Sequence, residues 1–126
     1  MTRFLAALAL ALTPTSALAL TEDECMALHP EITSAVEMVD CTMETEAGEK
    51  ALAEALTSLR AVLPEDLWAQ QEAAQAAWSA WRDAECAFEA APYPGSGGTG
   101  VEIQCRANLT LARRQQLVDA AELWKP

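Results

Sequence analysis

Four cysteines in a chain of 126 residues constrain the fold of this sequence more than any other feature. In an exported protein such cysteines form disulfides, whereas in the cytosol they stay reduced or bind metal. The N-terminus indicates the compartment: residues 1–3 are basic, 4–12 are apolar, and 13–19 end in Ala-Leu-Ala. This is the pattern of a secretory signal peptide. We therefore expect a signal peptide over residues 1–19 and one exported domain over 20–126, periplasmic or secreted.

The apolar run is too short for a membrane helix. A span needs about 20 consecutive apolar residues, and here Thr13, Pro14 and Ser16 interrupt the run while Glu22-Asp23-Glu24 follows it. A retained N-terminal anchor is the alternative, but the interruptions favour cleavage. We expect no integral membrane span in the mature chain.

All four cysteines lie in the expected mature chain, at Cys25, Cys41, Cys86 and Cys105. Four cysteines allow three pairings, and the sequence alone does not choose among them. We favour Cys25–Cys41 and Cys86–Cys105, each closing a loop of about 15–20 residues and contributing roughly 3 kcal/mol in the chain-entropy model. A zinc site is the alternative, but there is no Cys-x-x-Cys pair and His29 is the only imidazole. We predict two disulfides, no metal and no cofactor.

Helical periodicity runs through the mature chain. Leu52, Ala55 and Leu59 recur on one helical face, and an upstream stripe that includes Ile32 and Val36 is out of phase with it. We expect one long helix over about 31–63, and a bend near its glycine at position 48 is the alternative.

Two further helices are expected after Pro64. Residues 65–90 contain neither proline nor glycine and are rich in alanine. Residues 91–100 hold two prolines and four glycines, which predicts a loop. A last helix over about 101–123 is expected to place Cys105, Leu109 and Ala112 on its packed side. No segment alternates with period two, so we predict an all-α fold: a small antiparallel three-helix bundle stapled by two disulfides.

The middle helix carries a stripe with steps of three and four, made of Trp68, Gln71, Gln75, Trp78, Arg82 and Cys86. If Cys86 bonds Cys105, this stripe faces the last helix, and Arg82 is partly buried over the ring of Trp78. Glu85, an acid of the first helix or a cluster of carbonyl oxygens at a helix C-terminus would pair with Arg82, since Asp83 is expected to point elsewhere. We interpret the stripe as core; the alternative is a ligand groove lined by Trp78, Trp81 and Arg82, with Trp81 the exposed aromatic.

Several spaced residues resemble a known family. They are Gln75-x-x-Trp78-x-x-x-Arg82-Asp83-x-x-Cys86, Gly97-Gly98-Thr99, Cys105 and Thr110-x-x-Arg113-x-x-x-Leu117. Together they resemble the LprI-type lysozyme-inhibitor N-terminal domain, a helical family of exported bacterial proteins, over Cys25 to about Leu117. The resemblance implies a helical domain over 20–126 with a motif core of Gln75, Trp78, Arg82 and Asp83. Members often carry Leu-Asn-x-x-Tyr in the first long helix, whereas Leu52–Leu56 here lacks the amide and the phenol.

The charge of the chain limits its partners. A net charge of −11 excludes a nucleic-acid binder, which needs a basic surface. Residues 20–54 hold ten acids against one lysine, so this part attracts a cationic partner. Common lysozymes are cationic, and Glu44, Glu46 and Glu49 are the predicted contacts. The alternative is that the acids only keep the protein soluble.

The loop after the middle helix is the second candidate contact. Tyr93 offers a rigid amphipathic ring, and Ser96 and Thr99 offer hydroxyls that would bond a catalytic carboxylate. The disulfide Cys86–Cys105 would tether the loop and lower its ordering cost on binding. With Trp81 these complete the predicted partner-binding residues; the alternative is a plain helix connector.

Catalysis is not expected. His29 is the only histidine, and disulfide-bonded cysteines offer no nucleophile. We predict a non-enzymatic, exported, acidic helical protein that blocks lysozyme by reversible protein–protein binding. The alternative is an envelope or periplasmic binding module with another partner and no inhibitory role.

Overall fold

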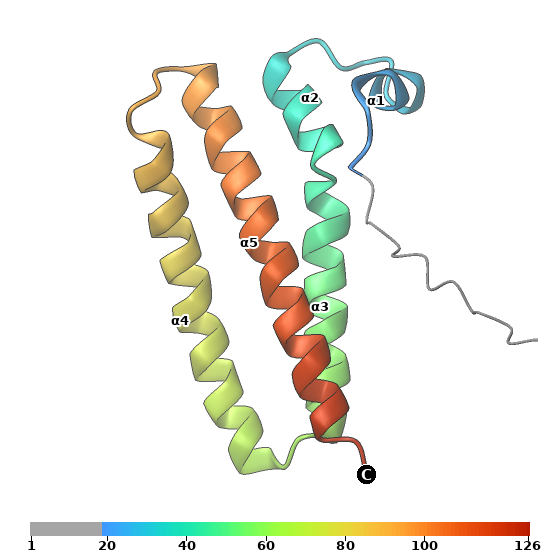
Figure 1. The fold of residues 1–126 in the computed structure, drawn as a ribbon, viewed down its shortest axis with the longest axis vertical. Coiled ribbons are helices and arrows are strands. Elements are labelled where there is room, and N and C mark those ends of the chain that lie inside the picture. Colours follow the sequence, from blue (N-terminus) through green and yellow to red (C-terminus); the bar gives the residue numbers. More distant parts are fainter. Residues whose placement is uncertain (1–18) are drawn as a thin grey trace, which may run out of the picture.

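The computed structural model describes residues 19–126, and the predicted signal peptide therefore lies outside the described residues except for Ala19. The described part contains five helices and no strand, which confirms the all-α class (Figure 1). The helices are α1 (Glu22–Leu28), α2 (Ala35–Thr42), α3 (Thr45–Val62), α4 (Glu65–Ala90) and α5 (Ser96–Leu123). The predicted count of three helices is wrong, because two short helices precede the three long ones.

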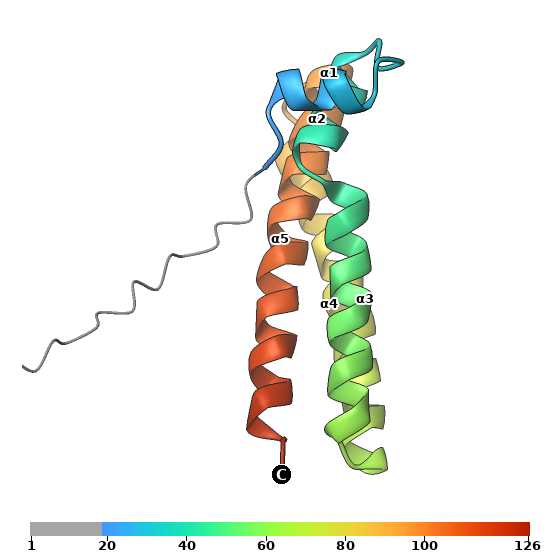
Figure 2. The same ribbon diagram turned by 90° about the vertical axis from the view of Figure 1, so that its right-hand side faces the viewer.

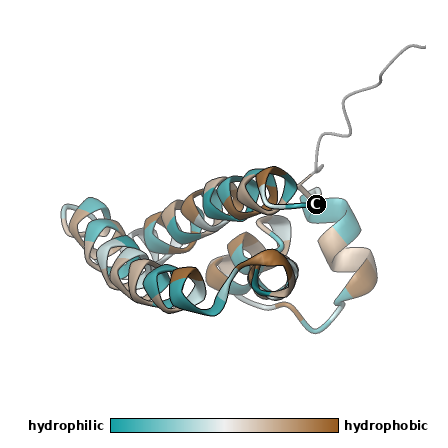
Figure 3. Ribbon diagram, turned by 90° about the horizontal axis from the view of Figure 1, so that it is seen from below, coloured by the Kyte–Doolittle hydropathy of each residue, from teal (hydrophilic) through white to brown (hydrophobic). Residues whose placement is uncertain are grey.

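The last helix is the central element of the molecule. α5 packs against α2, α3 and α4, while α1 packs against α2. The α3–α4 connection lies at one end of the three long helices and the α4–α5 connection at the other, with α1 across the end occupied by α2 (Figures 1 and 2). Viewed along this axis, hydrophilic and apolar residues alternate along each long helix, as expected for helices with one packed face (Figure 3).

The predicted single helix over 31–63 is wrong. α2 ends at Thr42 and α3 begins at Thr45, and Glu44 between them has a φ of +48° in the left-handed region. The break also differs from the alternative bend, because Gly48 lies inside α3. The break separates the two out-of-phase apolar stripes, since Val36 lies in α2, Ile32 lies in the segment before it, and Leu52 lies in α3.

Both short helices begin with a capping box. In α1 the backbone N–H of Thr21 donates to Glu24 Oε2 at 2.8 Å, and in α2 the backbone N–H of Ser34 donates to Glu37 Oε2 at 3.0 Å. Backbone hydrogen bonds from Thr21 and Thr33 hold the pKa of Glu24 and of Glu37 below the ordinary value. The Thr-x-x-Glu and Ser-x-x-Glu patterns were visible in the sequence and mark helix starts.

The cysteines follow the sequential pairing that we favoured. Cys25 pairs with Cys41 at a Cα–Cα distance of 6.0 Å and joins α1 to α2. Cys86 pairs with Cys105 at 5.5 Å and joins α4 to α5. Both separations lie within the range that a disulfide requires.

The connection between α4 and α5 is shorter than the predicted loop over 91–100, because α5 already begins at Ser96. Gly95 has φ +61° and ψ −139°, a conformation that only glycine adopts readily. Gly98 is buried, and a Cβ on it would lie 2.4 Å from the carbonyl oxygen of Tyr93 and 3.3 Å from that of Ala90. The absence of a side chain at Gly98 therefore lets the first turn of α5 pack on the end of α4.

The apolar core lies between α3 and α5. Leu52, Ala55 and Leu59 pack against Leu117 and Ala121, which confirms the predicted face of α3. The predicted packed side of α5 is wrong beyond Cys105, because the other buried residues of this helix include Thr110, Leu117 and Ala121, whereas Ala112 is exposed. The polar Thr110 lies in the buried row, so apolar spacing alone misplaces the face.

Alanine at two of the helical glycines, Gly98 and Gly48, should have opposite effects on stability. Gly98→Ala is expected to lower the free energy of unfolding by about 1–3 kcal/mol, because the added Cβ overlaps backbone carbonyls. Gly48→Ala meets no atom within 4 Å and should raise that free energy by about 0.5–1 kcal/mol through its better helix propensity. Urea unfolding of the oxidised protein measures both, and equal stabilisation by the two substitutions would contradict the close approach at Gly98.

Candidate functional site

A buried arginine lies where the three long helices meet. Arg82 of α4 is 6% exposed. Its Nη1 donates to Glu49 Oε1 of α3 at 2.7 Å and to Thr110 Oγ1 of α5 at 2.8 Å. Its Nε donates to Asp83 Oδ1 at 3.1 Å. The charge is thus compensated by hydrogen-bonded carboxylates, as a buried guanidinium requires.

A second group of contacts extends this cluster along α4 and α5. Arg106 Nη2 donates to Asp83 Oδ1 at 2.8 Å, and Arg113 Nε donates to Gln75 Oε1 at 2.9 Å. The guanidinium carbons of Arg82 and Arg113 lie 5.0 and 5.7 Å from the ring centroid of Trp78, within cation–π range. Burial lowers the pKa of Arg113, which stays protonated at physiological pH.

The family-like residues therefore gather in one place. Gln75, Trp78, Arg82 and Asp83 on α4 lie against Thr110 and Arg113 on α5 through the contacts given above. Arg82 is buried and hydrogen-bonded to three protein partners, so the interpretation as core agrees with the contacts and the ligand-groove alternative does not. The expectation that Asp83 points away from Arg82 is wrong, because the long arginine side chain reaches the carboxylate of its neighbour.

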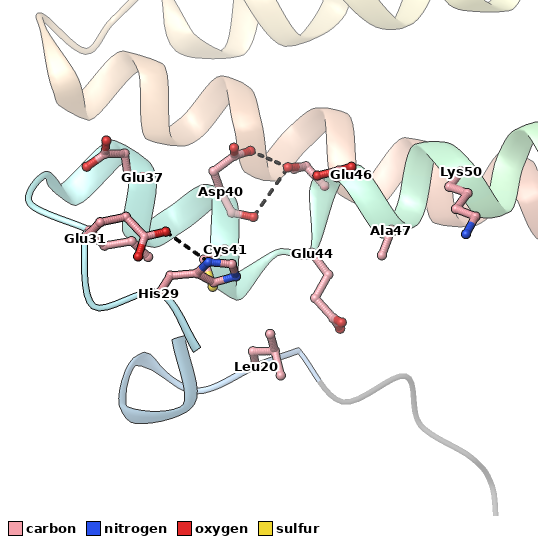
Figure 4. A pocket seen from close by; sticks show the side chains of 12 residues that line it. Leu20, His29, Glu31, Glu37, Asp40, Cys41, Glu44, Glu46, Ala47 and Lys50 are labelled. Carbon is pink, nitrogen blue, oxygen red and sulfur yellow. Dashed lines mark hydrogen bonds and ion pairs between the residues drawn. The ribbon is translucent and has the colours of Figure 1, made fainter. Parts of the chain in front are cut away.

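A shallow pocket lies at the junction of α2 and α3 (Figure 4). We call its carboxylates the acidic junction: Glu31, Glu37, Asp40, Glu44 and Glu46. Several already have partners, since Glu31 contacts His29 Nδ1 at 3.2 Å, Asp40 accepts from the hydroxyl of Thr45, and Glu37 caps α2. The side-chain carboxylates of Glu44 and Glu46 have no hydrogen-bond or ion-pair partner among the described residues. These two carboxylates are open to a cationic partner.

The third predicted acid is placed differently. Glu49 is 52% exposed at its side chain but pairs with the buried Arg82 at 2.7 Å. The carboxylate of Glu49 thus links α3 to α4, whereas the carboxylates of Glu44 and Glu46 make no such contact between helices.

An apolar groove adjoins the acidic junction. It runs between α3 and α5, and Asp40 and Glu44 line both it and the pocket of Figure 4. Its apolar residues include Met43, Ala47, Ala51, Ile103 and Leu111. Apolar surface bordered by charged groups is the composition of a protein-binding surface. The sequence did not reveal the groove, because its two sides come from helices about 60 residues apart.

The predicted loop residues lie in the α4–α5 connection and the first turn of α5. Tyr93 is 55% exposed, Ser96 and Thr99 are exposed, and Thr99 Oγ1 donates to the carbonyl oxygen of Gly95 at 3.5 Å. This connection lies in the same half of the molecule as α2 (Figure 1). Trp81 is exposed as expected, but it lies roughly two and a half helical turns before the end of α4. The structure thus places the loop residues in the half that carries the acidic junction, and it places Trp81 on the exposed face of α4.

Two features are absent from residues 19–126. No group of three or more His, Cys, Asp and Glu residues in this range is arranged to hold a metal ion. None of the helices described here has the length and apolar composition needed to cross a membrane.

Comparison with protein-family models gives a match over most of the chain. The model described as Lysozyme inhibitor LprI matches residues 25–117. The matched range includes both disulfides, the acidic junction and the Arg82 cluster. Comparisons with curated proteins and with solved structures give no match.

Removing the acid that pairs with Arg82 should destabilise the protein. Glu49→Ala is expected to lower the free energy of unfolding by about 1.5–3 kcal/mol, since a buried guanidinium loses a charged acceptor. Glu46→Ala, in the same helix and without a partner, should change it by less than about 0.5 kcal/mol. Urea unfolding of both variants provides the test, and equal effects would refute a stabilising role for the Arg82–Glu49 pair.

Proposed function

The chain belongs to the LprI lysozyme-inhibitor family, and from this membership we propose that it is an exported protein that blocks a cationic lysozyme by reversible protein–protein binding. Two observations support export: the signal-peptide pattern of residues 1–19 and the two paired disulfides. The family match supports lysozyme as the partner. Binding requires no chemistry from this chain, in keeping with the non-enzymatic role that the sequence suggests.

The observation that carries the proposal is the pair of free carboxylates beside an apolar groove. The carboxylates of Glu44 and Glu46 have no partner in the described part of the chain, and Glu44 also lines the groove between α3 and α5. On a chain of net charge −11, such groups raise the rate of encounter with a cationic partner. The neighbouring apolar residues then supply the short-range contact that slows dissociation.

Rigidity favours the same role. The α4–α5 connection is held by Cys86–Cys105 and by Gly98 packed on the end of α4. Tyr93 is thus presented on a constrained segment, which reduces the entropy lost when it inserts into a partner. In this proposal Tyr93 enters the lysozyme cleft while the acidic junction contacts its basic surface.

The primary test is a turbidity assay of cell-wall lysis with the oxidised chain and several classes of lysozyme. The double variant Glu44→Lys/Glu46→Lys should weaken inhibition by at least about tenfold, mainly through a slower association rate, and added salt should weaken inhibition by the unmodified protein. A matched control is Glu54→Lys/Glu72→Lys, which changes the charge equally at exposed positions on α3 and α4.

The control also defines the outcomes that contradict the proposal. An equal loss with Glu54→Lys/Glu72→Lys would show that net charge, not the acidic junction, drives the effect. If the unmodified protein inhibits no class of lysozyme, the result would favour the alternative of a binding module with another partner.

The α4–α5 connection has a separate test. Tyr93→Ala/Ser96→Ala should weaken inhibition by about tenfold or more while leaving the unfolding midpoint unchanged, because both side chains are exposed. Leu123→Ala, an exposed apolar truncation at the end of α5, should have no effect on inhibition. The inhibition constants of both variants are measured in the turbidity assay. An unaltered constant for the double variant would show that the α4–α5 connection does not contact lysozyme.

A further inference from the structure

The outer face of α4 has no partner within the described residues. α4 packs on α5 through a face that includes the buried Arg82, Cys86 and Ala90. The opposite face carries Trp81, which is 50% exposed, and Phe88, which is 75% exposed. We define the outer seam as the exposed row Gln70, Ala74, Ala77, Trp81, Ala84 and Phe88.

The outer seam is free of charge in a strongly acidic protein. The chain holds 19 acids against 8 bases. On one side the seam is flanked by alanines at positions 73, 80 and 87, and on the other by Gln71, Trp78 and Glu85. Of the four acids of this stretch, Glu85 lies beside the seam, and Glu72, Asp83 and Glu89 lie farther around the helix. The face therefore offers an apolar strip on which two acidic molecules meet without like charges in contact.

The spacing of the outer seam is that of a coiled-coil interface. Its residues follow one another at intervals of four, three, four, three and four, the a/d spacing with which one helix packs against another. We propose that the outer seam binds the outer seam of a second copy of this chain, with the two α4 helices antiparallel about a two-fold axis.

The seam is complementary to itself in one antiparallel register. When the axis passes beside position 79, Trp81 faces the partner's Ala77, Ala74 faces the partner's Ala84, and Phe88 faces the partner's Gln70. Each aromatic ring then meets a smaller side chain, and the alanine layers let the helices approach closely. An isologous interface requires this kind of self-complementarity.

The charge distribution favours a second copy over other occupants. A cationic protein is drawn to the acidic junction, and the seam has no carboxylate to hold it. An anionic membrane repels a chain of net charge −11. Two copies repel each other through every acidic face, which leaves the uncharged seam as the surface of closest approach.

The length of the seam sets the strength of the contact. Gln70 to Phe88 spans about 27 Å of helix, and one helix pair of that length buries less than the ~1,200 Å² at the lower limit of stable interfaces. The dimer is therefore weak and forms only at high protein concentration. Salt screens the repulsion between the two chains and strengthens the dimer, the reverse of its effect on lysozyme binding.

Sedimentation equilibrium of the oxidised chain tests the proposal, at about 10 µM to 1 mM protein and about 0.05 and 0.5 M NaCl. The dimer fraction should rise with concentration and with salt. Ala77→Glu/Ala84→Glu should weaken dimerisation at least about tenfold, because four carboxylates then meet at the seam. Ala112→Glu, at an exposed position of α5, is the control and should dimerise as the unmodified chain does. A monomer under all conditions, or an equal loss in the control, overturns the proposal.

A cross-linking experiment tests the register. Oxidation of Ala74→Cys/Ala84→Cys should give a covalent dimer, since each new thiol faces its counterpart in the second copy. Ala74→Cys alone should not cross-link, because the two copies of position 74 lie about 15 Å apart along the seam. Equal cross-linking of the single and double variants overturns the register. Binding of a monomeric chain to phosphatidylcholine vesicles, abolished by Ala77→Glu/Ala84→Glu, would instead assign the seam to a membrane.

Discussion

The hydrogen bonds of one guanidinium hold the three long helices in a fixed arrangement. α3 and α4 both pack on α5, and the pair between Arg82 and Glu49 joins residues 33 positions apart on the two outer helices. Thr110 of α5 completes this three-helix contact through its hydroxyl oxygen. Because these donors and acceptors are directional, they fix the helices in rotation as well as in distance, which apolar packing between Leu59 and Leu117 does less strictly.

This cluster explains which parts of the fold the sequence predicts. The long helix α4 and the packed face of α3 follow from composition and spacing, and the exposure of Trp81 follows from its angle to the stripe. The packed face of α5 does not, since Thr110 is buried to accept from Arg82, and that need exists only once the helices have met. The break at Glu44 is also hidden, because a glutamate in the left-handed conformation has no local sequence signal.

The candidate contact surface is likewise only partly predictable from the sequence. Acidic residues before position 54 predict an electrostatic surface, and the structure leaves Glu44 and Glu46 without partners while it pairs Glu49 with Arg82. Nothing local distinguishes these three acids, because the difference lies in which of them faces α4. The apolar groove depends on Met43 lying near Ile103, a proximity that follows from the packing of α2 and α3 on α5.

Both disulfides lie in the half of the molecule that holds α1 and α2 (Figure 1). The other half, around the α3–α4 turn and the C-terminus, depends on non-covalent packing of residues such as Leu59 and Ala121. Local unfolding should therefore begin at the end without cross-links and spread toward the end that holds the two disulfides. The acidic junction and Tyr93 would keep their shape through such partial opening, so under thermal or chemical stress this end of the protein would stay ordered after its far end has frayed.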